Sequence, residues 1–239
     1  GLNYTPEDPF AVPLRDISMT VRAGEIVGIA GVSGNGQDAL TRLLSGETRL
    51  SAFQAETVQL DREPVGTLGP DGRRQRGLHF VPEERLGRGA VPVHSLSENA
   101  LLTGYGSGLA RWGFLDFKAM RRFAARAIQD FDVRCGGPGS EAQSLSGGNL
   151  QKYIIGREIA FLPKVLLVSQ PTWGVDVGAA AAVRQRLVDL RDQGCAVLVV
   201  SEDLEELFEI ADRFHVMFRG RLSPAVGAAQ TNVERIGLA

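Results

Sequence analysis

The sequence of 239 residues has little cysteine, no long hydrophobic run and no excess of positive charge. Its two cysteines, Cys135 and Cys195, are too few for a disulfide framework and lie too far apart for a zinc site, which favours a reducing setting such as the cytosol. The longest apolar runs, near positions 165–168 and 196–200, are far shorter than the roughly 18 residues that a membrane-spanning helix needs. The sequence therefore predicts no segment that crosses a bilayer.

Basic and acidic residues almost balance, because 26 Lys and Arg accompany 28 Asp and Glu and give a net charge of -2. Domains that bind nucleic acid usually carry a basic excess, so neither DNA nor RNA is the expected partner. The sequence begins at Gly1 without a charged and then apolar leader, which predicts no secretion signal and fits a piece of a longer polypeptide. A hydrophobic share of 44% is enough for a sizeable globular core.

Short β-like runs alternate with helical patterns and predict an α/β fold. Four of the runs are almost entirely apolar, as in parallel strands that helices cover on both faces. The runs lie at 25–30, 77–81, 165–169, 196–201 and 214–218. From Val93 to Ser144, by contrast, no strong strand pattern exists, and an amphipathic helix follows Asp116, its expected cap. We expect a single domain with an α/β core at 1–92 and 145–239 and a helical subdomain inserted at 93–144.

A glycine-rich turn follows the first apolar run and leads into a helical pattern. Glycines let backbone N–H groups face phosphate oxygens, and a helix N-terminus beside them favours an anion. A typical phosphate loop has lysine and then serine or threonine where this sequence has Gln37 and Asp38. A structural turn therefore stays open beside a nucleotide-binding loop, whose candidate residues are Gly31, Ser33, Gly34, Asn35, Gly36, Gln37 and Asp38.

Three further segments place polar residues where a helix starts or a strand ends, at positions 145–152, 165–176 and 199–204. Each segment alone is a weak signal. Together with the glycine-rich turn, and in this order, they resemble the ATP-binding domain of ABC transporters. The resemblance covers nearly the whole chain and is strongest to the second, C-terminal domain of two in one polypeptide, as found in bacterial importers of simple sugars and nucleosides. Residues 146–152, 170–172 and 201–204 favour the nucleoside branch.

The resemblance implies a P-loop NTPase-like core with an antiparallel β portion and a helical subdomain. It places Gln37 where a lysine would bind phosphate and Asp38 where a hydroxyl would hold Mg²⁺. Three further positions are also changed: the metal-supporting aspartate, the catalytic glutamate and the switch histidine are replaced by Ser169, Gln170 and Glu202. The signature, in contrast, is intact in Ser146, Gly147 and Gly148, with Gln151 following.

These replacements remove a lysine and add carboxylates beside a polyanionic ligand. Each close pair of like charges costs roughly 4 kcal/mol at 4 Å and an effective dielectric of 20, and neutral Gln170 cannot accept a proton from water. We therefore predict that this domain alone is inactive or a very weak ATPase, with little or no nucleotide at its own site. Asp38 stays open as a metal ligand, and no other metal ligand is predicted.

In this family the signature contacts the γ-phosphate bound by the opposite domain, so the resemblance implies ATP with Mg²⁺ at a composite site with a partner. Glu83 and Asp176 stand at coupling positions, although Asp176 also suits a turn or helix cap. Phe10 is a candidate for stacking on adenine or for plain packing. Arg85 and Arg88 are expected to be solvated, with phosphate or a permease as the alternative contact, and Trp173 to pack.

The implied partners are a companion ABC domain in the same polypeptide, two membrane permease subunits and an extracytoplasmic solute-binding protein. The implied location is the cytoplasmic face of the bacterial inner membrane, as a peripheral protein. Two alternatives stay open: a self-sufficient homodimeric ABC ATPase with atypical catalytic residues, and a docking module that binds no nucleotide.

Overall fold

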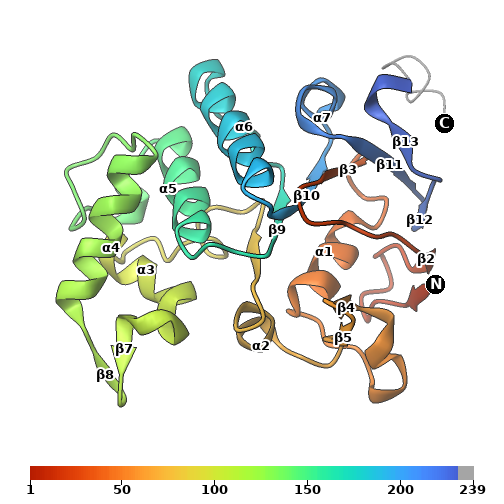
Figure 1. The fold of residues 1–239 in the computed structure, drawn as a ribbon, viewed down its shortest axis with the longest axis horizontal. Coiled ribbons are helices and arrows are strands. Elements are labelled where there is room, and N and C mark those ends of the chain that lie inside the picture. The colour runs from red at the N-terminus through yellow and green to blue at the C-terminus, as the bar shows by residue number, and fades with distance from the viewer. Residues whose placement is uncertain (231–239) are drawn as a thin grey trace. The chain divides into compact units, whose positions relative to one another are not determined.

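A computed structural model describes residues 1–230, apart from the side chain of Arg111 (Figure 1). The described chain divides into two compact units. The first contains Gly1–His79, Lys164–Gln170 and the chain from Leu187 onward, and the second contains Phe80–Pro163 and Pro171–Arg186. Each unit is described below by itself.

The first unit is built around a mixed, mostly parallel sheet with the strand order β12-β11-β3-β10-β9-β6. Strand β10 runs parallel to both β3 and β9, and β11 runs parallel to β3. The predicted runs are confirmed within a residue at their ends. The strands are β3 (Ile26–Ala30), β6 (Leu78–Val81), β9 (Val165–Ser169), β10 (Ala196–Ser201) and β11 (Arg213–Phe218), and antiparallel to β11 lie β12 (Arg221–Leu222) and β13 (Val226–Gly227).

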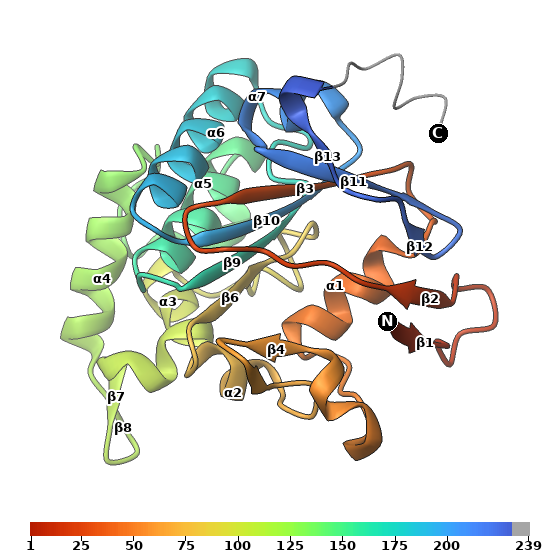
Figure 2. The same ribbon diagram turned by 45° about the vertical axis from the view of Figure 1, so that its right-hand side comes forward.

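Short antiparallel pairs complete the first unit and confirm the expected antiparallel β portion (Figure 2). They are β1 (Leu2–Tyr4) with β2 (Leu14–Ile17), and β4 (Gln59–Leu60) with β5 (Glu63–Pro64). The helices are α1 (Gln37–Ser45), α2 (Pro70–Arg74) and α7 (Leu204–Ile210), with 3-10 turns at Ala52–Thr57 and Ala228–Gln230, while α6 (Val177–Asp192) contributes to both units. Central strands β3 and β10 are wholly buried, as their continuous apolar runs predict.

The parallel register brings three strand ends to one edge of the sheet. Ser201 at the end of β10 lies opposite Ala30 at the end of β3, and Val200 lies opposite Ser169 at the end of β9. In open sheets of this kind, ligands bind outside the carboxyl ends of the strands. The glycine-rich turn and the polar residues after β9 and β10 therefore belong to one edge.

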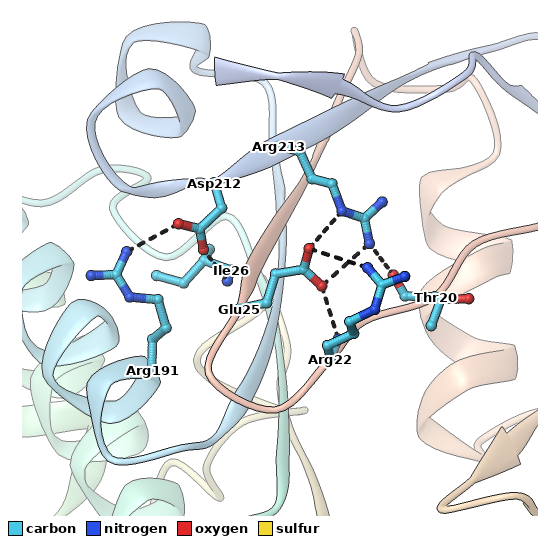
Figure 3. A network of polar contacts seen from close by, with 7 residues as sticks. All are labelled: Thr20, Arg22, Glu25, Ile26, Arg191, Asp212 and Arg213. Atoms are coloured by element: carbon cyan, nitrogen blue, oxygen red, sulfur yellow. Dashed lines mark hydrogen bonds and ion pairs between the residues drawn. The ribbon is translucent and has the colours of Figure 1, made fainter. Parts of the chain in front are cut away.

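The opposite, amino-terminal edge is held by charged side chains (Figure 3). The Arg213 Nε atom donates to Glu25 Oε1 at 2.6 Å, and the Arg22 N–H donates to Glu25 Oε2 at 2.9 Å. Asp212 Oδ2 accepts from the Ile26 N–H at 2.8 Å. Burial raises the pKa of Glu25, but hydrogen bonds from Arg213 and Arg22 outweigh it, so the carboxyl titrates below its ordinary value.

The second unit packs α3 (Leu96–Gly104), α4 (Phe117–Asp130) and α5 (Gly147–Ile159). Asp116 caps α4 as predicted, because its side chain accepts from the Ala119 N–H at 2.8 Å. The apolar stripe of α4 also packs as predicted: Met120 is buried with Ala100, and Phe123 stacks on Phe161 at 4.6 Å between ring centroids. This unit also contains 3-10 turn Ala142–Ser144, π-helical turn Tyr105–Leu109, and a hairpin of β7 (Ala110–Arg111) and β8 (Phe114–Leu115), which the sequence did not predict.

Buried polar side chains in the second unit form hydrogen bonds with backbone groups, which apolar side chains could not do. Arg157, 2% exposed, pairs with Glu158 at 2.8 Å and donates to the carbonyls of Asn99 and Gly89. The wholly buried Asn99 amide bridges the loop before α3, donating to the Val91 carbonyl and accepting the Val91 N–H. Such satisfied networks fix one arrangement of the surrounding backbone.

Candidate functional site

The glycine-rich turn Gly31–Asp38 connects β3 to α1 at the carboxyl edge of the sheet. Gly31 has a φ of 151°, and a Cβ there would lie 2.6 Å from the Met217 carbonyl oxygen and 2.9 Å from Gln37 Nε2. Only glycine fits so close to a neighbouring backbone. The sequence thus forms the expected strand, turn and helix N-terminus.

The Gln37 side chain fills the turn from inside. Its Oε1 accepts the Asn35 N–H at 3.0 Å, and its Nε2 donates to the Val32 carbonyl at 3.0 Å. The Asn35 side chain donates to the same carbonyl at 2.9 Å and accepts the Arg219 N–H. The side-chain amides of Gln37 and Asn35 therefore bond backbone groups of the turn. One N–H that a phosphate loop would present to a ligand, that of Asn35, is already bonded.

Asp38 lies in the first turn of α1 and pairs with Arg42 Nε at 2.7 Å. Both side chains are largely exposed, so this ion pair adds little stability. A carboxylate at a helix N-terminus interacts favourably with the helix dipole and competes there with an incoming anion. Among residues 1–230 no group of three His, Cys, Asp or Glu side chains could hold a metal ion.

The residues after β9 and β10 lie at the same edge as the turn. Gln170 is 8% exposed and has a φ of 49°, and its Oε1 accepts the Glu202 N–H at 3.2 Å. Ser169 is also buried, whereas Glu202 is exposed. The structure therefore places Ser169, Gln170 and Glu202 at two neighbouring strand ends. Gln170 is neutral and cannot accept a proton from water, as a glutamate at this position could.

The second unit holds the other helix start that the sequence singled out. Ser146 is the N-cap of α5, but its hydroxyl accepts from the Asn149 side chain at 2.9 Å and makes no bond to the helix backbone. Ser146 and Gly147 are exposed, Gly148 is buried, and the first N–H groups of this thirteen-residue helix have no partner within the helix. The α5 start is thus open to an external anion.

Residues of the same unit pack around this helix start. A Cβ on Gly148 would lie 3.3 Å from Asp176 Oδ2 and 3.4 Å from the Ala179 Cβ, so Gly148 and the predicted coupling residue are neighbours. Asp176 accepts the Ala179 N–H at 2.9 Å, and this bond lowers the pKa of Asp176. The helix-cap interpretation of Asp176 is therefore confirmed, and its coupling role is a separate question.

Arg85 differs from the expected solvated arginine. Its Nε donates to Gln151 Oε1 at 3.0 Å, and a Cβ on Gly147 would lie 3.0 Å from its Nη1 atom. The guanidinium thus lies beside the start of α5, and partial burial lowers its pKa without removing its charge. The spacing between positions 85 and 151 gives no sequence signal for this contact.

The remaining predicted residues lie apart from these contacts. Arg88 pairs with Glu84 at 2.8 Å, Glu83 is exposed, and Phe10 is 95% exposed in the segment between β1 and β2. Phe10 is therefore accessible for stacking. The expectation that Trp173 packs is wrong: its side chain is 63% exposed, because the turn after β9 directs it outward.

Comparisons with known proteins show the family and the fold of the chain. A family model described as ABC transporter matches residues 14–173. The nucleoside import ATP-binding protein NupA of Lactococcus lactis subsp. cremoris is 38% identical over 95% of this chain and 45% of its own length. The guanosine import ATP-binding protein NupO of Bacillus subtilis is 39% identical over 94% of this chain and 44% of its own length.

A third relative is the ribose import ATP-binding protein RbsA 1 of Rubrobacter xylanophilus, 37% identical over 95% of this chain and 45% of its own length. This chain therefore spans less than half the length of these relatives. The solved structure of the ATP-binding subunit of an ABC transporter has a TM-score of 0.78 and 18% identity, covering 99% of this chain and 95% of that one. No helix within residues 1–230 is long and apolar enough to span a membrane.

Proposed function

Because the chain belongs to the ABC transporter family, we propose that it is an ATP-binding domain of an importer of nucleosides or simple sugars. Relatives named for nucleoside, guanosine and ribose import support this substrate range. The chain matches less than half of each relative, so we propose a companion ABC domain in the same polypeptide, with this chain as the second, C-terminal domain. The core at 1–92 and 145–239 and the helical insert at 93–144 are part of this proposal.

In this proposal the domain's own nucleotide site is degenerate. The observation that carries it is the Gln37 side chain, which bonds the Asn35 N–H and the Val32 carbonyl inside the turn. A lysine at this position would instead extend a positive charge toward phosphate. Asp38 and Glu202 add negative charge at the same edge, and Gln170 offers no base. The residues present therefore do not fit triphosphate with Mg²⁺.

The second half of the proposal is that the α5 start completes the ATP site of the companion domain. Ser146 supplies a hydroxyl, Gly147 and Gly148 allow close approach, and the exposed N–H groups of α5 favour an anion. ATP with Mg²⁺ would be bound by the companion, and this chain would contribute hydrogen-bond donors to its terminal phosphate. Gln151 and Asp176 would hold this helix start in place, since Gln151 bonds Arg85 and Asp176 adjoins Gly148.

We also propose partner proteins for this domain, from the import functions that the names of its relatives state. An importer needs two membrane permease subunits and an extracytoplasmic solute-binding protein, which would place this domain on the cytoplasmic face of the bacterial inner membrane. Exposed Glu83 would take part in coupling to the permease.

Calorimetric titration of this chain with ATP and Mg²⁺ at micromolar concentrations tests the degenerate site. We expect no saturable binding and no release of phosphate. The Q37K/D38S variant, which restores the lysine and hydroxyl of a typical phosphate loop, is the matched control and should gain nucleotide affinity without turnover. Tight Mg²⁺-dependent binding by the unaltered chain would contradict the proposal and implicate Asp38 as a metal ligand. Robust turnover would establish the homodimeric ATPase instead.

A further inference from the structure

An exposed aromatic cluster projects from the second unit and has no role in the proposed nucleotide chemistry. It consists of the β7–β8 hairpin and its flanks, at the ends of α3 and α4 in Figures 1 and 2. The exposed fractions are 96% for Trp112, 80% for Phe114, 67% for Phe117 and 60% for Tyr105. Single exposed apolar residues need no explanation, but four aromatic side chains within thirteen residues indicate an interaction surface.

Trp112 occupies the first central position of the hairpin turn, where another residue type would be more stable. Trp112 and Gly113 have φ values of 55° and 81°, the left-handed pair of a type I′ turn. Asn or Gly is preferred at the Trp112 position, and a bulky residue there costs about 1–2 kcal/mol. Since the Trp112 ring is almost wholly exposed, packing within the chain does not compensate for this strain. Strained, exposed residues of this kind point to function.

Basic residues outnumber acidic residues in the sequence that contains the aromatic cluster. Residues 105–126 contain five basic side chains and one acidic side chain, in a chain whose net charge is -2. Within the described part of the chain, Lys118, Arg121 and Arg122 are exposed and pair with no carboxylate. They form one stripe of α4 at spacings of three and four, and the single carboxylate of the segment, Asp116, bonds the backbone as the helix cap.

We propose that the aromatic cluster and the basic stripe of α4 form a docking surface for an anionic lipid bilayer. Trp, Tyr and Phe are favoured at the level of lipid headgroups, and nearby Lys and Arg are attracted to acidic phospholipids by about 1 kcal/mol each. The stripe carries one sign of charge, which is complementary to a uniformly anionic surface. The Gly113 side of the turn is open, with no atom within 4 Å of an added Cβ, so the tip can enter the headgroup layer.

Tryptophan fluorescence tests this surface directly, because the chain has only two tryptophans. The W173F variant leaves Trp112 as the single reporter, and the W112F variant leaves Trp173 as its matched control; both residues are exposed. Each variant is mixed with vesicles of phosphatidylglycerol and phosphatidylcholine in equal parts, and with vesicles of phosphatidylcholine alone. We expect the Trp112 emission to shift to shorter wavelength with the anionic vesicles only, and the Trp173 emission to stay unchanged.

Charge reversal sharpens the test. Adding R121E/R122E to the W173F variant should weaken binding to anionic vesicles by roughly tenfold or more, and high salt should have the same direction of effect. Circular dichroism of this variant shows whether α4 remains folded. An unchanged Trp112 emission with every vesicle overturns the proposal and indicates a protein partner for the hairpin. Equal shifts of Trp112 and Trp173, or binding that ignores the charge reversal, overturn it as well. No outcome depends on nucleotide binding.

Discussion

The two helix starts that the sequence marked as anion sites differ in what their backbone groups contact. At the start of α1, Gln37 bonds the Asn35 N–H and the Val32 carbonyl, and Asp38 adds a negative charge paired with Arg42. At the start of α5, Ser146 and Gly147 are exposed, and the serine hydroxyl bonds only a neighbouring side chain. Neither helix has a side-chain cap, but one N–H of the turn before α1 is bonded by Gln37, whereas no side-chain bond to the backbone is formed by Ser146 at the start of α5.

This difference shows that a glycine-rich turn before a helix does not by itself make an anion site. Both segments have the glycines and the helix dipole that phosphate binding needs. What separates them is that the Gln37 side chain bonds one N–H of its turn, that of Asn35. In the function that we propose, such a side chain competes with phosphate while the fold around it stays the same.

The largest effect should follow from blocking the open helix start. In the two-domain polypeptide that we propose, S146R would place a bulky cation where the companion's terminal phosphate must approach. We expect the rate of ATP hydrolysis to fall by about 100-fold, the size of effect seen when a preorganised donor is lost. Steady-state phosphate release measures it. The matched variant Q37K alters the closed helix start and should change the rate by about twofold or less. Equal losses in the two variants would contradict the comparison.

A smaller effect, on stability alone, should follow from a change at the amino-terminal edge of the sheet. E25Q removes the carboxylate that Arg213 and the Arg22 N–H contact, and we expect the free energy of unfolding at pH 7 to fall by about 2 kcal/mol. Because the pKa of Glu25 is lowered by folding, its stabilising contribution is present above the unfolded pKa of about 4.3 and is lost as the pH falls below it.

Urea unfolding at pH 7 and pH 3 measures this difference, which should shrink at the lower pH. D61N is the control, since the pair of Asp61 with Lys164 is largely exposed and should contribute little. A difference between E25Q and the unaltered chain that is the same at both pH values would show that Glu25 acts through packing and not through its charge.

The smallest effect should be on the stability of the isolated chain, where substitutions at the two helix starts should differ. Q37A removes two hydrogen bonds inside the turn, so the free energy of unfolding should fall by about 1 kcal/mol and the Asn35 amide should exchange faster with solvent. S146A removes only a surface bond to Asn149 and should leave stability unchanged. Thermal unfolding and hydrogen exchange measure both. If S146A destabilises as much as Q37A, the α5 start is not the open one.

Much of the fold could be predicted because the decisive signals are local. Residues 165–169 and 196–201 form strands with the predicted ends, since continuous apolar runs fit strands that are buried on both faces. Asp116 caps its helix as predicted because an aspartate before an amphipathic pattern satisfies free N–H groups. The β7–β8 hairpin escaped prediction because its turn has Trp112 where Asn or Gly would give the signal.

The sequence predicted which residues lie at the candidate nucleotide site, but not the hydrogen bonds that they form. The sequence identified Gln37, Ser169, Gln170 and Glu202 as changed positions, and the register of the sheet explains why the last three lie together. That Gln37 turns inward depends on its rotamer, which no pattern of residue types encodes. The Arg85 bond to Gln151 joins positions 66 residues apart, and the outward Trp173 contradicts the rule that large aromatics pack.

The charged network of Glu25, Arg213 and Asp212 has a consequence for how this domain could change over evolutionary time. It anchors the sheet at the end remote from the glycine-rich turn, together with the wholly buried strands β3 and β10. These contacts do not involve the residues at the carboxyl edge. In the function that we propose, chemistry at that edge can be lost without loss of the scaffold.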